Sequence, residues 1–141
     1  MKIFFAFLSL ILISGEAMAK ELKYEGFVSW IEDSQIIEIG RIIRKEEKWK
    51  VVDRKKIVGE KSKNFSDLVA KKIAYENDRH RCFYLPRFMA KAKKEKEELE
   101  IWFCFGCFDF QAMGNLGTTE IKSFAPIAEK LLVLFEEHYK K

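Results

Sequence analysis

The chain has 141 residues, of which 48% are hydrophobic and 34% are charged, and its formal net charge is +4. This composition excludes a disordered tail, a collagen-like repeat and a multi-pass membrane protein. A chain of this length is expected to fold as one small domain. Basic and acidic residues are interspersed along it, so nucleic-acid binding is not expected from the charge pattern.

The first nineteen residues have the pattern of a secretory signal peptide. Lys2 supplies a positive charge, and residues 3–13 form a hydrophobic run that is shorter than the roughly 20 residues of a membrane-spanning helix. Residues 17–19, Ala-Met-Ala, place small side chains where a signal peptidase reads them. We therefore expect cleavage between Ala19 and Lys20, with export to the periplasm or to the outside of a bacterial cell.

The mature chain, residues 20–141, is expected to form a single domain whose first half contains a hairpin. Residues 35–44 are rich in isoleucine and predict a strand with a bulge near Gly40. A second strand is predicted over residues 49–58, and the short charged sequence KEEK between the two favours a hairpin turn. Residues 20–33 carry apolar side chains whose spacing fits a strand or a helix equally well.

Two helices are predicted from hydrophobic spacing. The first begins at Asn64, an N-cap residue, and ends near residues 76–78. Its apolar face follows the spacing i, i+4, i+8, with Leu68 beside Phe65, Val69 and Ile73. The second opens at Ser123 and Pro126. Its apolar face is predicted to consist of Ile127, Leu131, Leu134 and His138, next to Ala128, Leu132 and Phe135.

A second hairpin is predicted between the helices. Its arms are residues 81–90 and 99–111, which are rich in aromatic side chains, and the polar residues 91–98 join them. The resulting order after the signal peptide is β-β-α-β-β-α. This order predicts an α+β fold: an antiparallel sheet of about four strands, in two hairpins, with two amphipathic helices packed on one face.

Aromatic side chains crowd the second arm of that hairpin. A ligand-stacking platform and a buried core are both compatible with this density. Large apolar side chains contribute roughly 1.5–3 kcal/mol each when fully buried, so a small domain needs them inside. We therefore expect core positions for the aromatic residues of this arm, Trp102, Phe103, Phe105, Phe108 and Phe110.

Three cysteines offer the main chemical possibilities of the chain. Cys104 and Cys107 form a Cys-x-x-Cys pair, which occurs in thiol oxidoreductases where a following helix lowers the pKa of the first thiol. The residues that follow here predict a strand, which disfavours a redox role. A zinc site is the second possibility, with the Cys₃His ligand set of His80, Cys82, Cys104 and Cys107. An oxidising compartment disfavours it, because disulfide formation consumes thiols.

The third possibility is one disulfide and one free thiol. If the hairpin turn centres near residue 95, the register places Cys82 opposite Cys107, where opposed Cβ atoms lie about 4.5–5.5 Å apart, close to disulfide range. Cys104 then falls on the other face and is expected to remain a buried free thiol. The competing pair, Cys82 with Cys104, requires a slip in register of about three residues.

The same hairpin resembles a family of small, uncharacterised bacterial exported proteins and lipoproteins. The pattern is a cysteine followed by a proline within a strand, a polar turn, and then Cys-aromatic-x-Cys. Cys82, Pro86 and residues 104–107 match it, and the predicted elements before and after the hairpin are similar as well. The gap between Cys82 and Pro86 is one residue longer, and Phe83 stands where many members carry histidine. The resemblance implies export and brings no assigned activity.

Catalytic motifs are not found in the sequence. A Gly-rich phosphate loop and a Gly-x-Ser-x-Gly motif are both missing, and His80 and His138 are the only histidines. We therefore expect an exported, non-enzymatic, disulfide-stabilised binding domain without a cofactor, whose partner is a protein or a component of the cell envelope. The alternative is a thiol-redox or zinc-binding protein that uses Cys82, Cys104 and Cys107.

Overall fold

The computed structural model describes residues 20–78 and 82–140. The predicted signal peptide and His80 lie outside these residues. Two short 3₁₀ helices, η1 (Lys72–Ala74) and η2 (Ala125–Ile127), accompany the main elements. These are, in chain order, α1 (Tyr24–Ile31), β1 (Gln35–Lys45), β2 (Lys48–Lys56), α2 (Gly59–Val69), β3 (Phe88–Lys94), β4 (Glu97–Cys104), β5 (Asp109–Gly114), β6 (Gly117–Thr118), β7 (Lys122–Ser123) and α3 (Ala128–Tyr139).

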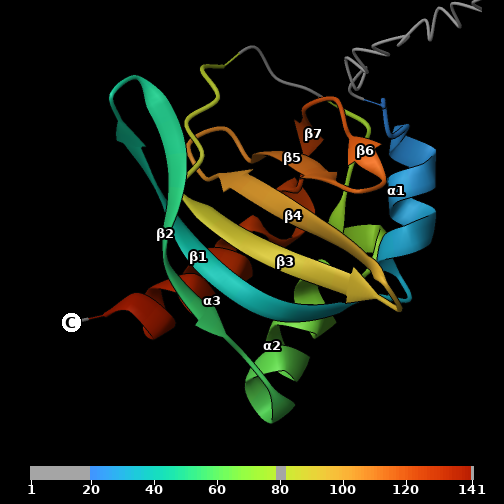
Figure 1. Cartoon of the computed structure of the whole chain (residues 1–141), viewed down its shortest axis with the longest axis horizontal. Helices are drawn as coiled ribbons and strands as arrows, with labels where there is room; N and C mark the ends of the chain where they lie inside the picture. Colours follow the sequence, from blue (N-terminus) through green and yellow to red (C-terminus); the bar gives the residue numbers. More distant parts are fainter. Residues whose placement is uncertain (1–19, 79–81, 141) are drawn as a thin grey trace, which may run out of the picture.

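The strands form one antiparallel sheet in the order β2-β1-β3-β4-β5-β6, and β7 also pairs with β5. Helices α2 and α3 lie behind the sheet, and α1 lies beside its right-hand edge (Figure 1). The α+β class is thus correct, but the expected sheet of about four strands with two helices is wrong. The described residues contain seven strands and three α-helices.

The sheet gains strands over the expectation in two ways. The short strands β6 and β7 were not predicted, and residues 99–111 are not one strand. Residues 105–108 form a turn that reverses the chain, so that Cys104 at the end of β4 faces Asp109 at the start of β5. Phe108 adopts a positive φ of 59° in this turn. The aromatic density of the segment is typical of a continuous strand, and it obscured the turn.

The first hairpin forms as predicted, with its bulge at Gly40. The pairing of β1 with β2 shifts between Ile39 and Arg41. A Cβ atom on Gly40 would lie 2.5 Å from Cγ1 of Val51 and 3.1 Å from Cε of Met89. The close approach of neighbouring side chains therefore requires glycine at this position.

The first predicted helix is displaced towards the N-terminus. Helix α2 begins at Gly59 and ends at Val69, so Asn64 lies inside it rather than at its start. Ile73, predicted to pack on the sheet, belongs to a 3₁₀ turn and is 81% exposed. Two serine hydroxyls explain the placement because they dock α2 on the backbone of Ile36: Ser62 Oγ donates to its carbonyl at 2.6 Å, and Ser66 Oγ accepts from its N–H at 2.9 Å.

The remaining helices are α1 and α3. Helix α1 lies within residues 20–33, where the sequence pattern was compatible with a strand or a helix. The start of the last helix is only partly as predicted. Pro126 lies in the first turn of the 3₁₀ helix that precedes α3, but α3 itself begins at Ala128. Ser123 ends β7, and its Oγ accepts a hydrogen bond from the N–H of Ala125 at 3.2 Å. None of the helices in the described part of the chain is long and apolar enough to cross a membrane.

The core lies between the sheet and the helices. Phe103 and Phe110 are fully buried there, as expected, whereas Phe105 is only partly buried and Phe108 is exposed. Trp102 lies on the opposite face of the sheet, because it alternates with the inward-facing Phe103 along β4. The fully buried phenylalanines are supplied by five elements and a loop: Phe27, Phe65, Phe103, Phe110, Phe124 and Phe135.

Candidate functional site

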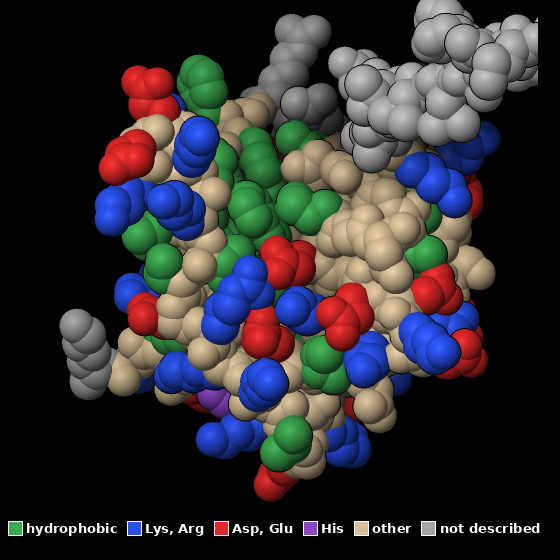
Figure 2. Space-filling view, viewed as in Figure 1, with side chains coloured by type: hydrophobic (Ala, Val, Ile, Leu, Met, Phe, Trp, Pro, Cys, Tyr) green, Lys and Arg blue, Asp and Glu red, His purple; other side chains and the backbone are tan. Residues whose placement is uncertain are grey.

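The face of the sheet that the helices leave open carries the polar chemistry of the molecule. In Figure 2, which looks onto this face, charged side chains lie at its centre, and apolar side chains gather next to them beside the β1–β2 hairpin. The register explains this division. Glu38, Lys91 and Glu100 are paired across β1, β3 and β4. Two residues away on each strand, and therefore on the same face, Gly40, Met89 and Trp102 are paired in the same way.

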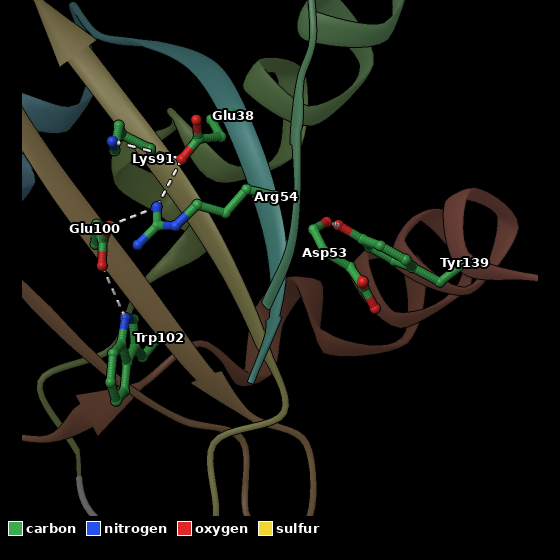
Figure 3. Close-up of polar contacts among 7 residues, drawn as sticks. All are labelled: Glu38, Asp53, Arg54, Lys91, Glu100, Trp102 and Tyr139. Carbon is green, nitrogen blue, oxygen red and sulfur yellow. Dashed lines mark hydrogen bonds and ion pairs between the residues drawn. The ribbon is translucent and has the colours of Figure 1, made fainter. Parts of the chain in front are cut away.

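Four charges on this face form a continuous network, which we call the charge ladder: Arg54, Glu38, Lys91 and Glu100 (Figure 3). The Arg54 guanidinium donates to Glu38 at 2.7 Å and lies 2.9 Å from Glu100. The Lys91 ammonium lies 3.5 Å from Glu38. Trp102 Nε1 donates to Glu100 at 3.3 Å. The ladder thereby connects β2, β1, β3 and β4.

Glu38 is the most buried side chain of the ladder, with 12% of its surface exposed. Burial alone would raise its pKa, but the hydrogen bond from Arg54 and the positive charges of Lys91 and Arg54 outweigh burial and lower it. Glu38 is therefore held ionised, and each carboxylate of the ladder faces a cation. This arrangement favours cross-strand stabilisation over acid–base catalysis, because a general acid or base needs a pKa close to the working pH.

A disulfide between Cys82 and Cys107 closes one end of the sheet. Their Cα atoms are 6.2 Å apart. The expected pair is thus present, but the expected geometry is not, because neither cysteine lies in a strand. β3 begins only at Phe88, opposite Phe103. The bond instead joins the loop before β3 to the turn between β4 and β5.

Cys104 is a buried free thiol next to this disulfide-linked loop. Its sulfur accepts a hydrogen bond from the N–H of Leu85 at 3.4 Å and lies 4.0 Å from the carbonyl oxygen of Phe83. The side chain is 1% exposed. Cys104 therefore supports the position of the loop from beneath.

The loop and the turn that the disulfide joins both expose large apolar side chains. We call these the apolar rim: Phe83, Leu85 and Phe108, which are 88%, 57% and 39% exposed. The backbone beneath them is well anchored. Tyr84 Oη donates to the carbonyl of Trp102 at 3.0 Å, and the N–H of Arg87 donates to the carbonyl of Phe103 at 2.8 Å. The rim side chains are therefore exposed on a loop with a defined conformation. A group of large apolar side chains exposed in this way can indicate an interaction site, whereas a single exposed apolar residue does not.

The zinc site of the sequence analysis is not assembled by the described residues. Cys82 and Cys107 are bonded to each other rather than present as thiolates, and His80 lies outside the described residues. No group of three or more His, Cys, Asp or Glu side chains within residues 20–78 and 82–140 is arranged to hold a metal ion.

Sequence reasoning did not find the charge ladder or the apolar rim. The one local signal for the ladder is Glu38, a carboxylate inside an isoleucine-rich strand, which indicates a charged partner on the neighbouring strands. Phe83 and Leu85 were placed in a strand, where alternation would bury one of every two side chains. In the structure both residues lie in the loop before β3, outside the sheet, and both are exposed.

Together these observations define a small α+β domain with one helix-covered sheet face, one open face and an apolar rim at its disulfide-linked end. Comparison of the chain with protein-family models, curated proteins and solved structures found no match in any of the three.

Proposed function

We propose that this chain is an exported, non-enzymatic domain that binds a partner protein through the apolar rim. The observation that carries the proposal is the exposure of Phe83, a large aromatic side chain that is 88% exposed in a loop tied down by a disulfide. Exposed aromatic side chains lower the stability and solubility of a free protein, so they indicate a surface that is covered in a complex.

The construction of the rim supports recognition. The disulfide and the hydrogen bonds of Tyr84 and Arg87 limit the conformations of the loop before any partner binds. A loop that is ordered in advance loses less conformational entropy on association, which strengthens binding. The seven-stranded sheet beneath supplies the rigid base on which such loops usually work.

The proposal is tested with wild-type and variant protein as immobilised bait for the exported proteins of the producing cells. Phe83→Asp replaces the most exposed side chain of the rim with a charge, and Ile73→Asp is its matched control, because Ile73 is 81% exposed and lies outside the rim. We expect a stoichiometric partner to be retained by wild type and Ile73→Asp and lost by Phe83→Asp. Thermal unfolding of all three proteins checks that they remain folded.

Retention of the same partners in the same amounts by Phe83→Asp would overturn the proposal. The alternative function, a thiol-redox or zinc-binding protein, is separated by counting free thiols and zinc in the purified protein. One free thiol per chain, from Cys104, with no zinc agrees with a structural disulfide. Three free thiols with one bound zinc, or a Cys104–Cys107 bond that forms and breaks under mild reductant, would replace the binding proposal.

A further inference from the structure

A groove runs where β1 and β2 meet the C-terminal half of α3. It consists of three adjoining hollows of about 420, 300 and 450 Å³. The first and second share Arg41, Tyr139 and Lys140, and the second and third share Lys55 and His138. Because neighbouring hollows share walls, the groove is elongated rather than a single pocket.

Basic side chains dominate the lining of this groove. Seven lining residues are basic and three are acidic. Arg41 is paired with Asp53, Arg87 with Glu136, and Arg54 with Glu38 and Glu100 of the charge ladder. The remaining cations of the lining are four lysines, so the positive charge that the groove offers to a ligand comes from them. The basic residues are Arg41, Arg54, Lys55, Lys56, Lys61, Arg87 and Lys140, and the acidic ones are Asp53, Glu136 and Glu137.

Apolar surface lies between these charges. Exposed apolar surface is supplied by Ile43, 39% exposed, at one end of the groove and by the partly buried Leu134 at the other. Phe88 and Ile57 line the same two hollows but are buried. The ring of Tyr139 lines the groove between them, with the Lys55 ammonium 4.4 Å from its centre. A ligand that carries only negative charge would leave this apolar surface unused, whereas a peptide has both charged and apolar groups.

The middle of the groove is held in place by bonds to the end of α3. Lys55 Nζ donates to the carbonyl of His138 at 2.6 Å, and Tyr139 Oη donates to the carbonyl of Asp53 at 2.9 Å. A lysine at this position satisfies a carbonyl at the helix C-terminus. The groove is therefore formed before any ligand binds, which lowers the entropic cost of association.

We propose that this groove binds an extended acidic segment of a partner protein. The basic side chains supply the complementary charge, and the apolar lining contacts the aliphatic parts of the segment. This inference does not depend on the apolar rim, because none of the rim residues lines the groove. Binding of a partner at the rim and binding of an acidic segment in the groove are separate events, and different variants weaken them.

His138 provides a local probe of binding. Partial burial lowers the pKa of its imidazole, the charges of Lys61 and Lys55 lower it further, and Glu137 opposes them. The ring also packs 5.2 Å from the ring of Phe65. Carboxylates bound in the groove would offset the lysine charges, so binding should raise the pKa of His138, which NMR titration of its imidazole signals measures.

The test uses the full mature chain and a synthetic peptide that alternates glutamate and leucine. We expect the peptide to bind, to bind more weakly as salt concentration rises, and to raise the pKa of His138. The double variant Lys61→Glu/Lys140→Glu should bind it roughly tenfold more weakly. Lys93→Glu/Lys96→Glu changes the net charge equally on residues outside the groove and should bind it like wild type.

Three outcomes would overturn the inference. Equal weakening by the two double variants would show that net charge alone attracts the peptide. An unchanged His138 pKa at saturating peptide would place the binding elsewhere. Tighter binding of inorganic polyphosphate, with the same response of His138 and of the variants, would make the groove a site for phosphate anions rather than for an acidic protein segment.

Discussion

Removal of the Cys82–Cys107 disulfide should lower the stability of the domain by an amount that follows from the chain it closes. The bond joins residues 25 positions apart, and in the chain-entropy model a loop of this length restricts the unfolded state by about 3.5 kcal/mol at 25 °C. Domains of this size have a total stability of about 5–15 kcal/mol. The double variant Cys82→Ala/Cys107→Ala should therefore lose a large part of its free energy of unfolding.

Urea unfolding followed by far-ultraviolet circular dichroism measures this loss. Wild-type protein in the presence of reductant should approach the stability of the double variant, because Cys82 is exposed to solvent. The double variant itself should not respond to reductant, and this insensitivity is the control. A loss below about 1 kcal/mol with an unchanged m-value would refute the reasoning, since the bond would then not restrict the unfolded chain as the loop length implies.

Three further predictions concern the sheet and its helices. Leu131→Ala truncates a fully buried side chain of α3 and should lower the free energy of unfolding, measured in urea, by about 2–5 kcal/mol. Val133→Ala, on the exposed side of the same helix, should lower it by less than about 0.5 kcal/mol. Equal losses would mean that α3 is not docked as described. Gly40→Ala should cost about 1–3 kcal/mol, because its Cβ would lie 2.5 Å from a methyl carbon of Val51, and an unchanged midpoint would contradict the tight packing at the bulge. Because the pKa of Glu38 is lowered in the folded protein, its ionised form stabilises the fold at pH values above the ordinary pKa of 4.5, and this stabilisation is lost as the pH falls through the lowered pKa. The difference in free energy of unfolding between wild type and Glu38→Gln should therefore shrink between pH 7 and pH 3. A constant difference would rule out the linkage.

Features that depend on residues close together in the chain were predictable before the fold was known. An isoleucine-rich run and a short charged turn predicted the β1–β2 hairpin, and Gly40 marked its bulge. Pro126 marked the 3₁₀ turn that leads into the last helix, because a proline suits the first turn of a helix whatever it packs against.

The displaced helix and the extra turn depended on contacts between distant segments. Asn64 has the side chain of an N-cap, but α2 starts five residues earlier because Ser62 and Ser66 bond to the backbone of β1. The turn at residues 105–108 was not recognised because its aromatic residues are equally typical of strands.

The candidate site was decided almost entirely by the tertiary structure. Glu38, Lys91 and Glu100 become neighbours only when three strands pair in one register, and Arg54 reaches them only from a fourth. The Cys82–Cys107 pair was predicted from a strand register, yet loops outside the strands bring the two cysteines together. Local sequence patterns indicate the conformation of a segment, whereas the exposure and charge pairing of side chains depend on which segments meet in space. For this reason the apolar rim and the basic groove could be recognised only in the folded structure.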